Sequence, residues 1–150
     1  RTIRKKKNEI SIDKSVIYLI IAIPTIVFTI WTLFCGSIQI RCNDRDFNIE
    51  AKGWNDYTGE YSQIGSISYE VNVLQNNNDY RTNGFGNLKY AMGNFNNDIF
   101  GDYIRYTHAS CHSYVVMNID GKILVVNGEN DAETKEIYQR ISEKVSKERK

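Results

Sequence analysis

The uncharged stretch at residues 15–40, SVIYLIIAIPTIVFTIWTLFCGSIQI, decides how the rest of this chain is arranged. It holds 26 residues without a charge, and its densest part runs from residue 16 to residue 34. Because a helix rises about 1.5 Å per residue, this part can cross most of a hydrocarbon core of roughly 30 Å. The stretch therefore predicts a transmembrane helix at residues 15–36. The residues assigned to the membrane include Val16, Pro24, Trp31 and Phe34.

A cleaved signal peptide is the alternative explanation of the apolar stretch. The stretch is longer than the usual apolar region of about 7–15 residues, and no small-residue cleavage site follows it. Cys35 stands near the depth of a lipoprotein anchor, but the two residues before it are bulky. We therefore expect an intact anchor. The chain begins with Arg1 rather than Met, so we also expect that an upstream segment is missing.

Charge is distributed unevenly on the two sides of the apolar stretch. Residues 1–14 carry a net charge of +4, and the remaining 136 residues carry −3. Basic residues beside a span favour the cytoplasmic side. We expect a single-pass protein of the cell membrane with a cytoplasmic tail at 1–14 and an extracytoplasmic domain at 37–146, followed by a charged tail at 147–150. The reversed orientation, with the domain in the cytoplasm, is the alternative. Lys5–Lys7 are expected to orient the helix rather than to bind lipid.

The chain after Gly36 alternates apolar and polar residues, which is the pattern of half-buried strands. Residues 38–42 and 47–52 flank the turn Asn43–Asp46 and predict a hairpin. Asp120-Gly121 predicts a second hairpin, because this dipeptide suits a two-residue turn. Residues 75–79 are predicted to form a polar loop without a hydrophobic anchor. Further strands are expected at residues 66–73, 80–82, 88–95, 103–110, 114–119 and 122–127, with a break at 83–86.

The last element has helical periodicity. Asn130 is the predicted N-cap, and Glu133 follows three residues later as in a capping box. The expected inner face of the helix is formed by Thr134, Ile137, Tyr138, Ile141 and Val145. The predicted fold class is α+β: an N-terminal transmembrane helix, then an antiparallel sheet or barrel of about seven strands, then one C-terminal amphipathic helix.

This order of elements, together with a set of glycine-aromatic landmarks, resembles a bacterial pleckstrin-homology-like (PH-like) domain family, as a membrane-anchored member. The resemblance covers roughly residues 37–145 and implies no defined biochemical activity. The turn Asn43–Asp46 carries one cation and two anions, so phosphoinositide binding is not expected. The landmarks are Arg81–Gly86, Gly93-Asn94-Phe95, Gly101-Asp102-Tyr103, Val125-Val126-Asn127 and Ile137-Tyr138.

Few residue clusters in this chain suggest chemistry. His108, Cys111 and His112 are possible metal ligands, but the paired spacing of zinc sites is missing, so no metal or cofactor is expected. Cys42 and Cys111 could form a disulfide outside the cell, or both could be small core residues. Gly84-Phe85-Gly86 is too short for a phosphate loop. No nucleophile motif is present, and we do not expect an enzyme.

These observations predict an interaction module presented next to the membrane, which binds a protein or peptide partner without catalysis. Contact with the lipid bilayer is expected through the span. Nucleic acid is not expected as a partner, because a net-negative domain gains nothing from counterion release. The alternative is a membrane-anchored sensor of a small ligand or of envelope stress, which requires an apolar pocket with convergent polar groups. A metal protein built on His108, Cys111 and His112 is a third hypothesis.

Overall fold

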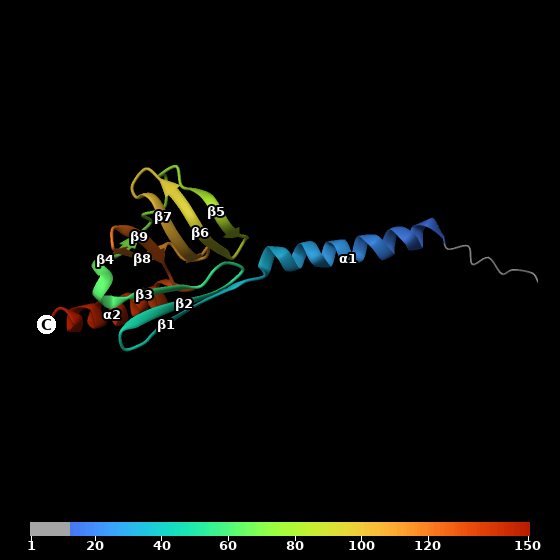
Figure 1. Ribbon diagram of the computed structural model, residues 1–150. Helices are drawn as coiled ribbons and strands as arrows, with labels where there is room; N and C mark the ends of the chain where they lie inside the picture. Colours follow the sequence, from blue (N-terminus) through green and yellow to red (C-terminus); the bar gives the residue numbers. More distant parts are fainter. Residues whose placement is uncertain (1–12) are drawn as a thin grey trace, which may run out of the picture. The chain divides into compact units, whose positions relative to one another are not determined.

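The computed structural model describes residues 13–150, and the basic run Lys5–Lys7 lies outside the described residues. Two compact units make up the chain, one ending at Thr32 and the other comprising Leu33–Lys150. The first contains most of one long helix, and the second contains nine strands and a C-terminal helix among the described residues (Figure 1). The fold class is thus α+β, as predicted.

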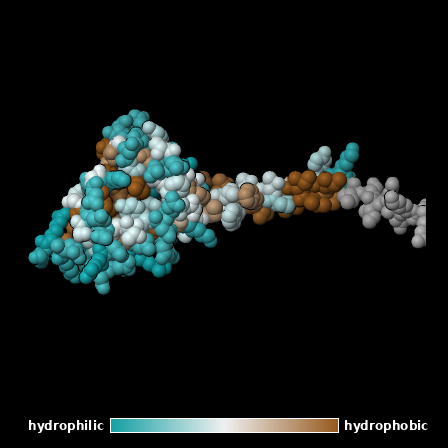
Figure 2. Space-filling view, viewed as in Figure 1, coloured by the Kyte–Doolittle hydropathy of each residue, from teal (hydrophilic) through white to brown (hydrophobic). Residues whose placement is uncertain are grey.

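The helix α1 (Lys14–Phe34) is the one helix among residues 13–150 that is long and apolar enough to cross a membrane. None of its residues is buried, and hydrophobic side chains cover much of its surface (Figure 2). Pro24 lies inside it, as expected. The hydroxyls of Thr25, Thr29 and Thr32 each donate to a main-chain carbonyl three or four residues earlier. These polar side chains are therefore satisfied within the helix, which suits an apolar environment.

Two sheets form the second unit. The three-stranded sheet has the order β1-β2-β3, and the six-stranded sheet has the order β4-β8-β9-β7-β6-β5. A short 3-10 helix at Tyr61–Gln63 connects the two sheets. The bounds are β1 (Ser37–Cys42), β2 (Asp46–Lys52), β3 (Tyr57–Glu60), β4 (Ile64–Val71), β5 (Tyr80–Gly86), β6 (Tyr90–Asn97), β7 (Gly101–His108), β8 (Ser113–Ile119), β9 (Lys122–Val126) and α2 (Asp131–Glu148).

The predicted number and direction of the strands need correction. The described residues form nine strands rather than about seven, and β7 pairs with β9 in parallel, so the strands are not all antiparallel. The strand β3 was not expected, because it is short and contains Gly59, which lies against the Phe47 ring. The expected break at residues 83–86 is also wrong, since β5 continues through Gly84 and Gly86.

The hairpins predicted from local sequence are confirmed. β1 and β2 pair from Ser37 opposite Lys52 to Cys42 opposite Phe47. β8 and β9 are joined by Asp120 and Gly121, which both have positive φ, as a two-residue turn of this type requires.

The six-stranded sheet is buried on both faces near its centre. Successive residues of β8 and β9 enter two different hydrophobic clusters, which explains their nearly continuous apolar sequence. The larger cluster lies between the two sheets and α2, and it includes Phe47, Ile49, Met117 and Ile141. The smaller cluster lies on the opposite face of the six-stranded sheet and includes Leu74, Phe95, Tyr103, Tyr114, Val116 and Val125.

The segment between β4 and β5 covers this second cluster. Leu74 is buried there, and Asp79 lies 2.7 Å from Arg105 in an ion pair that is mostly shielded from solvent. Tyr103 and Asn97 also donate to the Asp79 carboxylate. Residues 75–79 form a loop without a hydrophobic side chain, as predicted, but the polar side chain of Asp79 and the preceding Leu74 hold it in place. Leu74 and Asp79 lie at the two ends of the loop. Because they are single residues, a sequence pattern of apolar runs does not reveal them.

The helix α2 begins as the sequence predicts. The Asn130 side chain accepts a hydrogen bond from the Glu133 N–H at 3.0 Å, as an N-cap does. The Glu133 carboxylate accepts from the Glu129 N–H, one residue earlier than in a capping box. Thr134, Ile141 and Val145 are buried on the predicted inner face.

The core tyrosines predict a loss of stability at alkaline pH. Tyr106 is buried and donates to the Asn55 carbonyl at 2.7 Å. Burial, helped by the Asp56 carboxylate, raises the pKa of Tyr106 to about 12. Because this pKa lies above the ordinary value near 10, its contribution is complete below pH 10 and is lost as pH rises toward 12. The free energy of unfolding should therefore fall over this window.

Tyr106→Phe should reduce the slope of the free energy of unfolding against pH by up to about 1.4 kcal/mol per pH unit, which is the effect of one titrating proton. At neutral pH the same change should cost about 1 kcal/mol, because one buried hydrogen bond is lost. Tyr80→Phe is the control, since Tyr80 is exposed. Denaturant unfolding of the detergent-solubilised chain at a series of pH values measures both effects. An unchanged slope in Tyr106→Phe would contradict the assignment.

Candidate functional site

The strand β1 has one open edge. It is paired with β2 on one side, and within the described residues no strand pairs with its other side. The Asn43 N–H donates to the Asp46 carbonyl, so this pair exchanges main-chain bonds, and the pattern alternates along the hairpin. It follows that the main-chain N–H and C=O groups of Ile38 and Ile40 point away from β2. The Ala51 N–H, opposite Ile38, correspondingly points away from β1 and binds Asp56 at 2.8 Å.

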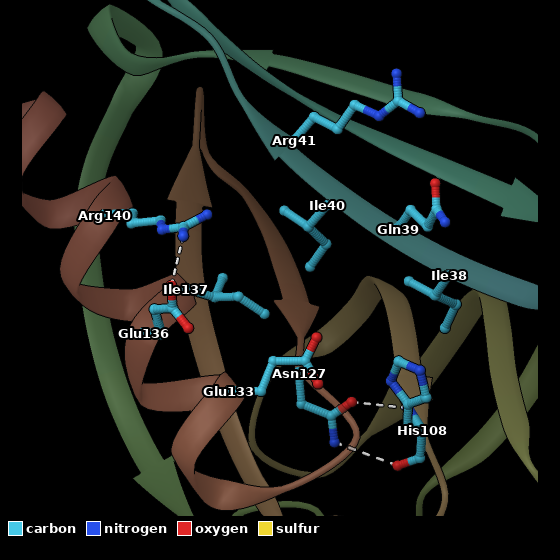
Figure 3. A pocket seen from close by; sticks show the side chains of 10 residues that line it. All are labelled: Ile38, Gln39, Ile40, Arg41, His108, Asn127, Glu133, Glu136, Ile137 and Arg140. Carbon is cyan, nitrogen blue, oxygen red and sulfur yellow. Dashed lines mark hydrogen bonds and ion pairs between the residues drawn. The ribbon is translucent and has the colours of Figure 1, made fainter.

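A groove of about 310 Å³ lies along this open edge. One wall is β1, the other wall is α2, and the floor is formed where β7 and β9 end (Figure 3). Ile38, Ile40 and Ile137 make its walls partly apolar. The complete lining is Ile38, Gln39, Ile40, Arg41, His108, Asn127, Glu133, Glu136, Ile137 and Arg140. The groove has room for side chains of a segment lying beside β1.

The side chain of Asn127 fixes the floor of the groove. Asn127 is fully buried and follows the last pair of the parallel ladder, Tyr106 with Val126. Its side-chain oxygen accepts from the His108 N–H at 2.7 Å, and its amide nitrogen donates to the carbonyls of His108 at 3.2 Å and Cys111 at 3.1 Å. The amide therefore continues the hydrogen bonding of the ladder beyond the end of β9.

The ring of His108 is the least satisfied group of the groove. The residue is 8% exposed, and among the described residues the buried Nδ1 is the side-chain nitrogen that lacks a hydrogen-bond partner. The ring contacts the Tyr90 ring at a centroid distance of 5.2 Å. A buried polar atom without a partner costs about 1–3 kcal/mol, and native proteins contain few of them. Because Nδ1 is closed to solvent, an occupant of the groove with a donor group removes this cost only once the His108 ring turns toward it.

The charged side chains at the rim largely neutralise one another. Arg41 lies 3.2 Å from the Glu50 carboxylate, and Arg140 pairs with Glu136 one turn earlier on α2. The Glu133 carboxylate is occupied by the Glu129 N–H. Exposed pairs of this kind contribute at most about 1 kcal/mol each. The rim therefore favours neither a strongly anionic nor a strongly cationic occupant.

The two cysteines suggested for a disulfide are not brought together. Both are free thiols, and different parts of α2 lie near them. Cys111 is buried near Thr134, in the first turn of the helix. Cys42 is half-buried on β1, where burial raises the pKa of its thiol, and the cations near it belong to later turns of α2. These positions agree with the alternative interpretation, in which both cysteines are small residues of the interior.

The possible metal ligands His108, Cys111 and His112 point to different surroundings. The His108 ring packs against the Tyr90 ring at a tilt of 59°, Cys111 faces α2, and His112 is exposed. Residues 13–150 contain no group of three histidine, cysteine or acidic side chains placed to hold a metal ion. Sequence reasoning considered His108 only as a possible metal ligand, with no metal expected, and missed its place in the groove. It also missed the role of Asn127, although a polar residue directly after Val125-Val126 was a usable signal.

A second hollow, of about 510 Å³, lies on the six-stranded sheet. It combines the aromatic side chains of Phe95 and Tyr103 with the polar groups of Asp102 and Lys122. This is the combination that a small-molecule site requires. The hollow shares Phe95 and Tyr103 with the second hydrophobic cluster.

No family model, curated protein or solved structure matches this chain. The PH-like resemblance is thus neither supported nor contradicted by a relative. The open edge of β1, the groove beside it and the unpartnered nitrogen in the floor of the groove are the features that bear on function.

Proposed function

We propose that this chain is a membrane-anchored interaction module that binds an extended segment of a partner protein on the open edge of β1, without catalysis. The observation that carries the proposal is the position of this edge beside a groove of suitable size. A strand added to a sheet edge gains main-chain hydrogen bonds, and pockets for alternate side chains give specificity. Both elements of this recognition mode lie along β1.

The groove suits a segment of modest charge with one apolar and one hydrogen-bonding side chain. The main-chain groups of Ile38 and Ile40 would pair with the segment, which would fix its register. An apolar side chain would lie between β1 and Ile137, where burial contributes roughly 25 cal/mol per Å². A hydroxyl or amide would donate to the Nδ1 of His108 once the ring turns toward the segment, because this buried nitrogen has no partner in the part of the chain that is described.

The membrane placement is part of the same proposal. The helix α1 would anchor the chain in the cell membrane as a single span, with residues 1–14 in the cytoplasm and the domain outside. The charge difference between the two flanks supports this orientation. The partner would then be a protein at or near the outer membrane surface. The composition of the turn between β1 and β2 supports the exclusion of phosphoinositides, since its one cation, Arg45, stands between Asp44 and Asp46.

A PH-like ancestry also belongs to the proposal. An amphipathic C-terminal helix that closes a core between two sheets supports it. The two additional strands and the parallel pair β7–β9 differ from the seven antiparallel strands that the resemblance implies. The relationship would therefore be a distant one, with the groove beside α2 as the feature that matters for function.

The alternative function, sensing of a small ligand, is favoured by the second hollow. Phe95 and Ile123 would contact an apolar part of the ligand, and Asp102 or Lys122 would orient its polar part. Binding there would leave the β1 edge unoccupied. The two functions can be separated by mapping which of the two surfaces a ligand protects.

The strand-addition proposal predicts that removing one main-chain donor of β1 weakens peptide binding. Peptides selected from a phage-displayed random library against the detergent-solubilised full chain provide the probe. Ile40→Pro removes an N–H that faces away from β2, which an edge strand tolerates. The dissociation constant should rise about tenfold, the equivalent of one hydrogen bond. Fluorescence anisotropy of labelled peptide measures it.

Thr58→Pro is the matched control for this experiment. Thr58 lies on β3, at the opposite edge of the same sheet, and the register places its N–H away from β2 as well. This variant should bind the selected peptides as the unchanged chain does. Equal affinity of Ile40→Pro and Thr58→Pro would contradict strand addition, as would a failure of the library to yield any retained peptide.

The unpartnered nitrogen in the floor of the groove predicts that replacing His108 changes peptide affinity without lowering the free energy of unfolding. His108→Phe removes the unpartnered nitrogen and keeps an aromatic ring against Tyr90, while the main-chain bonds to Asn127 remain. The free energy of unfolding should stay unchanged or rise by about 1 kcal/mol. Affinity for selected peptides that carry a hydroxyl or amide side chain should fall severalfold. A clear loss of stability without a change in affinity would assign His108 a structural role instead.

A further inference from the structure

We propose that the turn between β5 and β6, residues Asn87–Lys89, is a second membrane contact that rests on the lipid headgroup region beside the end of α1. This inference uses one part of the proposed function, that α1 lies in a bilayer, and it is independent of peptide binding. The turn presents an apolar and a cationic side chain next to each other. Its partner is the bilayer in which the chain is anchored.

The turn is hydrogen-bonded to the residues that end the apolar helix. The Asn87 side-chain amide donates to the Cys35 carbonyl at 2.7 Å, and the Leu88 N–H donates to the Leu33 carbonyl at 3.3 Å. All of these residues belong to the unit Leu33–Lys150. The Asn87 side-chain oxygen also accepts from the N–H groups of Lys89 and Tyr90, which fixes the shape of the turn.

The length of α1 places these bonds close to the membrane boundary. Its 21 residues span roughly 30 Å, about the thickness of the hydrocarbon core. Tyr18 and Trp31 lie toward its two ends, where amphipathic aromatic side chains favour the headgroup level. Leu33 follows Trp31 by two residues. A group bonded to the Leu33 carbonyl is therefore near the boundary, however the rest of the domain is tilted.

The two side chains of the turn suit this environment. Leu88 is 63% exposed, so most of this apolar side chain is left uncovered by the described part of the chain. Lys89 places its ammonium 5.6 Å from the centre of the Phe34 ring, beside the end of the helix. An interfacial leucine gains from contact with acyl chains, and a lysine keeps its charge among lipid phosphates while its stem covers apolar surface.

The connection after α1 keeps the turn in place. Only Cys35 and Gly36 separate α1 from β1. Gly36 has a φ of +111°, and a Cβ there would lie 3.1 Å from both the Lys52 carbonyl oxygen and the Tyr90 ring. Residue 36 is thus closely packed against Lys52 and Tyr90 within the unit Leu33–Lys150.

Quenching by labelled lipids tests the contact in the intact chain. Dansylalanine is incorporated at position 88 of the full chain, which is reconstituted in vesicles of phosphatidylcholine and phosphatidylglycerol that contain headgroup spin-labelled lipid. Emission from position 88 should be blue-shifted and quenched severalfold more than emission from position 99. Ile99 is the matched control, because it is also an exposed apolar residue but lies at the other end of β6.

A probe at position 31 distinguishes failure of the contact from failure of the span. Quenching at 31 and 88 but not at 99 supports the proposal. Quenching at 31 alone overturns the contact and leaves the anchor intact. No quenching at 31 overturns both, because the chain is then not in the bilayer. Asn87→Ala, which releases the turn from Cys35, should reduce quenching at 88 and leave quenching at 31 unchanged. Equal quenching at 88 and 99 would show a non-specific association of the domain with lipid and would also overturn the proposal.

Discussion

The bond between the Asn127 side chain and the main chain of His108 is the interaction on which the arrangement of the domain depends. It closes the end of the parallel ladder between β7 and β9, and the same amide reaches the Cys111 carbonyl. Two segments that are distant in sequence, residues 108–111 and Asn127, are thereby held at one point. The chain then enters α2 three residues later, at Asn130, so the bond also determines where the helix starts relative to the sheet. The groove exists because His108 and Asn127 form its floor beside the open edge of β1.

Features that depend on neighbours in sequence could be predicted from the sequence, and features that depend on distant partners could not. The β1–β2 hairpin, the Asp120-Gly121 turn and the Asn130 cap are local, and the structure has each of them. The parallel pairing of β7 with β9 depends on which strands meet after β8 has turned back, and alternation of side chains carries no such information. The anchoring of residues 72–79 depends on Arg105, which lies on another strand.

The candidate site was predictable only in its parts. Ile38 and Ile40 were expected on the apolar side of a strand, and Ile137 was expected on the inner face of the helix. That these residues face one another across a groove follows from the strand order, which places β1 at an edge. His108 drew attention because of its neighbours Cys111 and His112, yet the fold separates these three side chains and gives His108 a different environment. Sequence proximity was misleading there.

The open edge of β1 also raises the question of why it does not pair indiscriminately. An exposed sheet edge is a template for aggregation, and proteins usually shorten or cover such edges. The other edge of the same sheet, β3, is only four residues long. The β1 edge is longer, but α2 runs beside it and limits access to segments that fit between strand and helix. An edge covered in this way selects its partner by shape. A segment can form main-chain hydrogen bonds with β1 only if its side chains fit into the groove. Selectivity of this kind requires no charged pocket, which agrees with the neutralised rim around Arg41 and Arg140.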